Sequence, residues 1–215
     1  MVQRTGIIII LRFIHREHNM IHWLKDNPTE RTLKRMIIFS VLLLLVSAPA
    51  IIWLLESSNF PGGLDETQLG FDGEYIRECF STMNEQDINT FIQGNIADYV
   101  FMLSYGLMFF SSALFLTRKL NEGRIKQLGY ILCILGVGAS CCDAIENVFI
   151  ISMALNPVQF PEWLAIPHSI FAHLKFNLMY ITSGGILLLI IMNIIYWVQR
   201  KTLRKGLIEK VEMIK

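Results

Sequence analysis

The segment of residues 128–155, LGYILCILGVGASCCDAIENVFIISMAL, decides the fold class of this chain. It is apolar almost throughout, and it exceeds the roughly 20 helical residues that cross a bilayer core at about 1.5 Å per residue. Three more apolar segments of spanning length lie at about 36–55, 96–117 and 163–198. Of the 215 residues, 53% are hydrophobic and 17% are charged. The sequence therefore predicts an all-α integral membrane protein with four spans.

Lysine and arginine are distributed unevenly among the segments outside these spans. Seven precede the first span, four lie between the second and third, and six follow the last. Loop 56–95 contains Arg77 as its one basic residue, against eight acidic residues. Because Lys and Arg accumulate in cytoplasmic loops, we expect an antiparallel four-helix transmembrane bundle in the cell membrane, with both termini cytoplasmic and loop 56–95 outside. Topology accounts for the cations, so we expect the lipid bilayer as a partner and no nucleic acid.

The chain divides into three parts on this interpretation. Residues 1–27 are basic and amphipathic, with an apolar run too short to span, and we expect them to lie on the cytoplasmic leaflet. Residues 28–198 form the four-span domain. Its first helix is expected to extend from Pro28, with Asn27 as the N-cap. Residues 199–215 form a basic cytoplasmic tail.

Two alternatives concern the start of the chain. Translation could begin at Met20, in which case the preceding residues are upstream sequence. Ala48-Pro49-Ala50 also has the pattern of small residues at a signal-peptide cleavage site. Cleavage is disfavoured because the apolar run continues to Trp53, a residue that suits the membrane interface.

The loop between the first two spans carries a helical signal of its own. Pro61-Gly62-Gly63 is typical of a turn, and apolar residues recur at helical spacing from Tyr75 to Met83. We therefore expect a short amphipathic helix that caps the outer end of the bundle.

Polar side chains interrupt segment 128–155 near its end. Asp143, Glu146 and Asn147 stand at positions i, i+3 and i+4, so they share one face of a helix. Ionisable residues within spans usually face the bundle interior or a water-filled cavity, where they find partners. This face is therefore expected to point toward the other spans and away from lipid.

The neighbouring spans carry polar residues to the same depth. Counted from the cytoplasmic side, the third span places Asp143 about 22 Å into a core of about 30 Å. The second span leaves Asp98 about 3 Å inside the outer boundary, and the fourth brings Lys175 close to that boundary. Tyr105 lies two helical turns from Asp98, and His168 lies two turns from Lys175. We expect one polar site between spans two, three and four, just below the outer surface.

Three carboxylates against one ammonium would give this site an excess of negative charge. A proton, an imidazolium, a metal ion or a cationic ligand group would balance it. We interpret the site as one that binds a lipid headgroup or small polar molecule, with chemical processing as a further option. Asp143 and Glu146 would act as acceptors or as a general acid/base pair, and Lys175 as the partner of an anion. The orienting groups would be Tyr105, Asn147 and His168.

Other function classes fit the same residues. The ionic groups could form an interhelical clasp in a structural or assembly subunit, with Asp98 capping the start of the second span. A proton- or cation-coupled transporter is a further alternative, although the inner two-thirds of the spans hold no ionisable residue to relay an ion. Carboxylates and histidine could bind a divalent metal, but the spans contain no HExxH motif and no His pair at i, i+4. Enzymatic activity, cofactor and oligomeric state are left open.

The four cysteines give little support to redox or metal chemistry. Cys133, Cys141 and Cys142 lie in the third span and Cys79 lies in the outer loop, without C-x-x-C spacing. We interpret them as small buried hydrophobes.

A sequence pattern connects these features to a known group of proteins. The pattern consists of Asp98-Tyr99-x-Phe101-x-x-x-Tyr105, Asp143-x-x-Glu146-Asn147, and a lone Lys175 opening the last span. It resembles that of small, mostly uncharacterised prokaryotic four-span membrane proteins, which also have a Pro-Gly-Gly-like turn and a short helix in the first outer loop. The resemblance covers roughly residues 36–198 and leaves out residues 1–27. It implies the four-span fold and the polar site, and it implies no particular activity.

Overall fold

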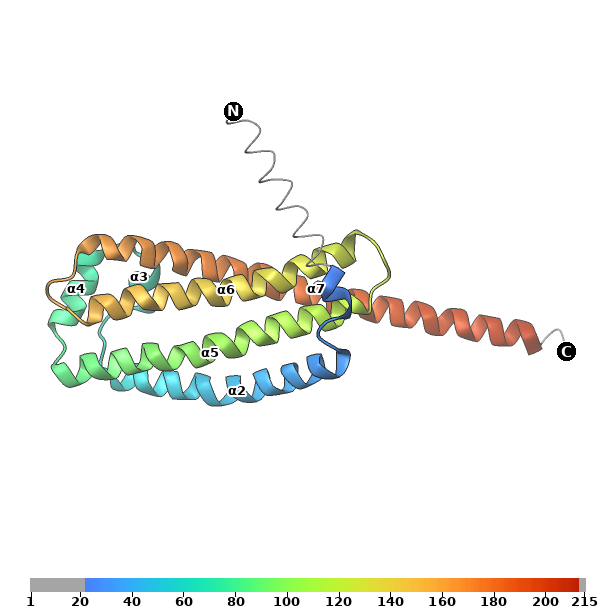
Figure 1. Cartoon of the computed structure of the whole chain (residues 1–215), viewed down its shortest axis with the longest axis horizontal. Coiled ribbons are helices and arrows are strands. Elements are labelled where there is room, and N and C mark those ends of the chain that lie inside the picture. The colour runs from blue at the N-terminus through green and yellow to red at the C-terminus, as the bar shows by residue number, and fades with distance from the viewer. Residues whose placement is uncertain (1–21, 213–215) are drawn as a thin grey trace, which may run out of the picture.

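The computed structural model describes residues 22–212, with side chains described for residues 22–204. Every regular element in this part of the chain is a helix (Figure 1). The elements in chain order are α2 (Glu30–Ser57), α3 (Leu64–Leu69), α4 (Gly73–Ser81), α5 (Glu85–Arg118), α6 (Arg124–Ala154), η1 (Glu162–Leu164) and α7 (Ala165–Glu212).

Four of these helices are long and apolar enough to cross a membrane, namely α2, α5, α6 and α7. This confirms the all-helical prediction with four segments of spanning length. The four helices lie side by side, and consecutive ones run in opposite directions (Figure 1). Helix α5 packs against α2, α6 and α7, and α6 packs against α7. The face of α6 that carries its polar residues therefore has α5 and α7 as neighbours.

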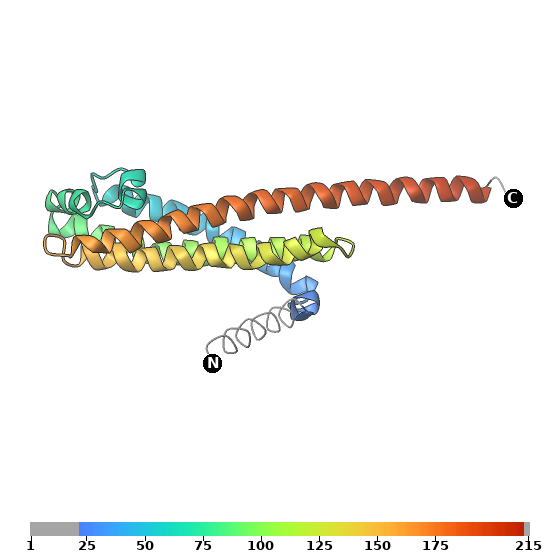
Figure 2. The ribbon, with the colours of Figure 1, turned by 90° about the horizontal axis from the view of Figure 1, so that it is seen from above.

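The long helices extend beyond the apolar segments from which they were predicted. Helix α5 begins at Glu85, before the expected start of the span at residue 96, because Asn84 and Asp87 form a capping box there. Helix α7 has 48 residues, about 72 Å at 1.5 Å per residue, and it projects past the other long helices (Figure 2). A helix can continue through polar residues as well as through apolar ones. Hydropathy therefore predicts where the apolar span lies but not where the helix begins and ends.

The predicted start of the first helix is wrong by two residues. Helix α2 begins at Glu30, and its N-cap is Thr29 in place of Asn27. The Thr29 hydroxyl accepts a hydrogen bond from the backbone N–H of Thr32 at 3.2 Å. Threonine is itself a good N-cap, so the local pattern offered two competing starts.

Helices α3 and α4, which lie between α2 and α5 in the chain, fold over one end of the bundle (Figure 1). The short helix η1, between α6 and α7, contacts α4 there. We call this end, with α3, α4 and η1, the cap end. The predicted amphipathic helix is present as α4, whereas α3 was not predicted. Ile76, Cys79 and Phe80 of α4 are buried. The Phe80 ring lies 5.4 Å from the ring of Phe91 in α5 and 6.3 Å from the ring of Phe160. This apolar contact seats the cap on the ends of the long helices.

The opposite end of the bundle is rich in lysine and arginine, and we call it the basic end (residues 30–35, 118–126 and 200–204). Small residues allow α6 to approach α5 closely between the two ends. A side chain at Gly136 would place its Cβ 2.5 Å from the Phe109 Cβ. Close approach through glycine is how membrane helices gain packing energy without a hydrophobic drive.

Candidate functional site

A buried ion cluster joins α6 to α7 near the cap end. The Lys175 Nζ lies 2.9 Å from Asp143 Oδ1 and 2.5 Å from Glu146 Oε2. The three side chains are only 7%, 5% and 1% exposed, respectively. Glu146 Oε2 is paired with the ammonium, which occupies only part of a carboxylate's acceptor capacity of about four lone-pair sites. The Glu146 carboxylate therefore keeps the capacity to accept a hydrogen bond from another group.

Helix α5 contributes two further contacts to this cluster. The Tyr105 hydroxyl donates to Asp143 Oδ2 at 2.9 Å, so both Asp143 oxygens have partners. One turn farther along α6, the Asn147 amide donates to Asp98 Oδ2 at 2.9 Å and to the Asn95 carbonyl at 3.1 Å. The structure thus brings together residues from three helices that the sequence placed at one depth.

Asp98 cannot cap the start of α5, as one structural alternative expected. The helix begins at Glu85, so Asp98 lies more than three turns inside it. Orphan backbone N–H groups exist only in the first turn. Asp98 instead has the Asn147 amide as its hydrogen-bond partner, within the bundle.

His168 lies beside the cluster, but its ring contacts backbone carbonyls instead of the carboxylates. Its Nε2 is 3.2 Å from the Thr67 carbonyl of α3, and its Nδ1 is 3.4 Å from the Glu146 carbonyl of α6. A neutral imidazole donates through one nitrogen only, so the tautomer decides which carbonyl receives the proton. In the structure, His168 thereby connects α3 of the cap to α6 and α7, and it also lines the cavity described next.

A cavity of about 270 Å³ opens beside Glu146 and His168. Its walls come from the end of α2, from α3, and from α5, α6 and α7. The Gln68 Oε1 atom, on a lining residue, is buried and has no hydrogen-bond partner in the described structure. The polar lining residues are Glu56, Thr67, Gln68, Asn95, Glu146 and His168, and the apolar ones are Leu55, Phe60, Leu64, Phe91 and Ile150, with Gly62 in the wall.

The charges of the site do not balance among the side chains that the structure describes. Asp98, Asp143 and Glu146 carry three negative charges when ionised, against the single positive charge of Lys175. Asp98 is half-buried, and its hydrogen-bond partner is an amide, which lowers the cost of leaving water without neutralising the charge. A carboxylate that is partly removed from water and lacks a countercharge is costly. The arrangement therefore favours a proton or a cationic group from outside the chain.

The described residues offer no ready-made centre for a metal ion. Among them, no three His, Cys, Asp or Glu side chains converge as a metal site requires. The four cysteines are all free thiols, and the interpretation as buried hydrophobes holds for Cys79 and Cys133 but is wrong for Cys141, which is exposed. The donor set of the site consists of oxygen acceptors, one ammonium and one phenol, a chemistry that suits hydrogen bonding and ion pairing.

Sequence reasoning missed the cavity and the residues that complete its wall. Asn95 carried a signal, because it lies one turn from Asp98 on the same face of α5. Gln68 and Thr67 carried none, since α3 is a short helix without an apolar period. Tyr99, which belongs to the sequence pattern around Asp98, donates to the Ala144 carbonyl at 3.1 Å and so also connects α5 to α6.

Comparison with known proteins finds no match for this chain. No protein-family model, no curated protein and no solved structure is similar enough to be counted as a match. The chemistry of the site is therefore inferred from the residues and distances described above.

Proposed function

We propose that this chain is a multi-pass protein of the cell membrane that binds a lipid headgroup or small polar molecule in the cavity beside Glu146. The carrying observation is that Glu146 belongs to two features at once. It is part of the buried ion cluster with Lys175, and it lines the cavity. A molecule in the cavity can therefore contact a carboxylate that still has acceptor sites beyond the one that pairs with Lys175.

We place the cap end on the outer side of the membrane, with both ends of the chain in the cytoplasm. The distribution of charges supports this orientation. Lysine and arginine collect at the basic end, and the cap segment between α2 and α5 is acidic. Cytoplasmic loops carry the excess of Lys and Arg. The cavity would then open at the level of the outer leaflet, and the chain would belong with the four-span proteins that its sequence resembles.

The ligand that fits best carries a positively charged or hydrogen-bond-donating group next to an apolar part. Its cationic group would complete the charge balance beside Glu146, and the unpartnered oxygen of Gln68 would accept a further hydrogen bond. Leu55, Phe60 and Leu64 supply apolar contact on the opposite wall. Few polar groups in a largely apolar wall are typical of small-molecule sites.

Asp143 and Lys175 would then hold Glu146 in position without contacting the ligand themselves. Lys175 holds both carboxylates at fixed positions, and Tyr105 fixes the second oxygen of Asp143. If the protein also processes its ligand, Glu146 is the group in reach of it and is the candidate acid or base.

A structural clasp is the second candidate, and one observation favours it. Lys175 contacts both carboxylates in a nearly water-free setting, so the cluster joins α6 to α7 without any ligand. The clasp and the ligand site differ in what they require of the cavity. A clasp is indifferent to Gln68 and Leu64, whereas a ligand site is not.

Native mass spectrometry of the protein extracted in mild detergent tests the proposal. The wild type should retain a molecule that is lost from Glu146→Gln and reduced in Gln68→Leu and Leu64→Trp, which alter the cavity but leave the ion cluster intact. Glu162→Gln is the matched control, because Glu162 pairs with Arg77 at an exposed site of the cap end. Retention unchanged in all three cavity variants, with lower stability in Glu146→Gln alone, would establish the clasp instead.

A further inference from the structure

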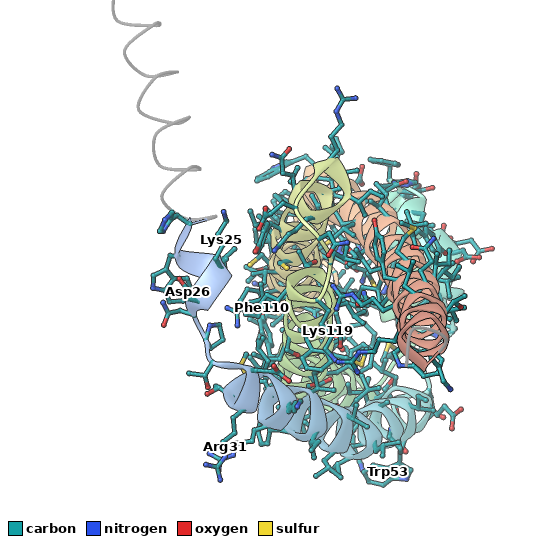
Figure 3. All side chains as sticks on the ribbon, turned by 90° about the vertical axis from the view of Figure 1, so that its right-hand side faces the viewer. Lys25, Asp26, Arg31, Trp53, Phe110 and Lys119 are labelled. Carbon is teal, nitrogen blue, oxygen red and sulfur yellow. The ribbon has the colours of Figure 1, made fainter. Side chains whose placement is uncertain are left out.

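A second groove lies at the basic end, between the end of α5 and the middle of α7. Its volume is about 660 Å³. Viewed from this end, Lys119 lies between α7 and the other long helices (Figure 3). The lining residues are Leu116, Arg118, Lys119, Leu120, Ile190, Asn193, Ile194, Tyr196, Trp197 and Arg200. The groove is remote from Glu146 and shares no residue with the outer cavity.

The cations that line this groove have uncharged partners. The Arg118 guanidinium donates to the Leu24 carbonyl through Nε at 3.0 Å and through one terminal nitrogen at 2.7 Å, and its other terminal nitrogen donates to the Pro28 carbonyl. Arg200 donates to the Asn121 side-chain oxygen at 3.0 Å. The lining contains no acidic residue. Among the described residues, none of these cations forms an ion pair with a carboxylate, and the neighbouring Glu30 is itself paired with Lys34.

Lys119 is the most available of these cations. It is exposed, and its Nζ lies 3.9 Å from the centre of the Phe115 ring. A cation over an aromatic ring is attracted but keeps its full charge. The nearest acidic residue in sequence, Glu122, is paired with Lys126 at 2.9 Å. Lys119 thus remains able to pair with an anion in the groove.

The other wall of the groove is apolar and aromatic. Ile190 and Ile194 of α7 are 39% and 55% exposed, and Trp197 is 63% exposed. The isoleucines lie within the apolar span, and Trp197 lies near its end, at the depth where tryptophan anchors a helix to the membrane interface. One groove therefore offers cations at the interface and apolar side chains that continue from it into the bilayer core.

We propose that this groove binds an anionic phospholipid, with its phosphate between Lys119 and Arg200 and an acyl chain along Ile190 and Ile194. Basic pockets between membrane helices suit such headgroups, because a phosphate accepts several charge-assisted hydrogen bonds at once. The two halves of the groove match the two halves of the lipid. This assignment does not rest on the function proposed for the outer cavity.

The test uses the full-length protein in nanodiscs of mixed phosphatidylglycerol and phosphatidylcholine, with native mass spectrometry of the released complex. The wild type should retain phosphatidylglycerol in preference to phosphatidylcholine. Lys119→Gln/Arg200→Gln should lower that preference by about tenfold or more, since each cation contributes several-fold to anionic lipid binding. Lys119→Gln alone, at an exposed position where folding is not at risk, should lower it by several-fold.

Two controls separate this groove from the general charge of the basic end. Arg31→Gln/Arg35→Gln removes the same number of charges from exposed positions on α2, where Arg31 points away from the bundle (Figure 3). It should leave the preference unchanged, as should Lys119→Arg/Arg200→Lys. An equal loss in the α2 variant would overturn the assignment to the groove. Displacement of the lipid by excess glycerol 1-phosphate would overturn it in favour of a soluble phosphate.

Discussion

Replacing Lys175 by methionine removes the one cation of the outer site while keeping a long apolar side chain. In the wild type its ammonium lies 2.9 Å from Asp143 and 2.5 Å from Glu146, and the two carboxylates are 5% and 1% exposed. The variant leaves these carboxylates buried and close together without a positive charge. We expect the pair to take up one proton, because two buried like charges cannot both persist.

The expected loss of stability follows from the free energy of that protonation. For a carboxyl with an ordinary pKa near 4.3, protonation at pH 7 costs about 4 kcal/mol, at about 1.4 kcal/mol per pH unit. This agrees with the roughly 3–5 kcal/mol that breaking a buried ion pair costs. At pH 5 the same protonation costs about 1 kcal/mol. The loss in Lys175→Met should therefore be large at pH 7 and should shrink as the pH falls.

Unfolding by sodium dodecyl sulfate in maltoside micelles, followed by tryptophan fluorescence at both pH values, measures this difference. Lys34→Met is the matched control, because Lys34 pairs with Glu30 at 2.7 Å and both side chains are more than half exposed, and such surface pairs contribute less than about 1 kcal/mol. Asp143→Asn/Glu146→Gln/Lys175→Met should regain most of the stability without regaining the ligand. A loss that is the same at pH 5 and pH 7, or no loss at all, would refute the reasoning.

Three further predictions concern the packing and the orientation. Tyr105→Phe removes one interhelical hydrogen bond and should lower the free energy of unfolding by about 1 kcal/mol, within the range of such bonds in membranes, as the same titration would show. Gly136→Ala should lower the free energy of unfolding by about 1–3 kcal/mol, because the added methyl group overpacks α6 against α5. Gly184→Ala, where a Cβ meets open space, should be neutral or stabilising by up to about 1 kcal/mol, and equal effects of the two variants would contradict the packing. An impermeant maleimide added to intact cells should label Glu74→Cys at the cap end and leave Arg124→Cys at the basic end unlabelled, and the reverse result would invert the proposed orientation.

Much of the outer site could be read from helical spacing and membrane depth. Asp143, Glu146 and Asn147 share a face because a helix repeats every 3.6 residues. Lys175 meets them because a bilayer of fixed thickness sets the depth at which each residue of a span lies. Membrane depth and helix face were together enough to predict that the ammonium, two carboxylates and the Tyr105 phenol lie close together.

The cavity could not be predicted in this way. Its wall combines Leu55 at the end of α2 and Gln68 in α3 with Glu146 and His168 of the bundle. Helix α3 has six residues, too few to show a hydrophobic period. Its position depends on contacts with residues distant in sequence, such as the contact of the Thr67 carbonyl with the His168 ring. Sequence spacing placed His168 near the site, but it could not give the backbone carbonyls of Thr67 and Glu146 as its partners, because spacing gives the face of a residue and not what that face contacts.

The sequence by itself determined that the chain is helical, that four segments can cross a membrane, and that ionisable groups gather at one depth. These properties follow from hydropathy and from the helical period, which act along the chain. The tertiary structure decided which carboxylate lines the cavity, which oxygen of Asp143 each partner takes, and that Lys119 and Arg200 line one groove from two helices. Those features depend on the distances between side chains of separate helices, and the local sequence carries no information on those distances.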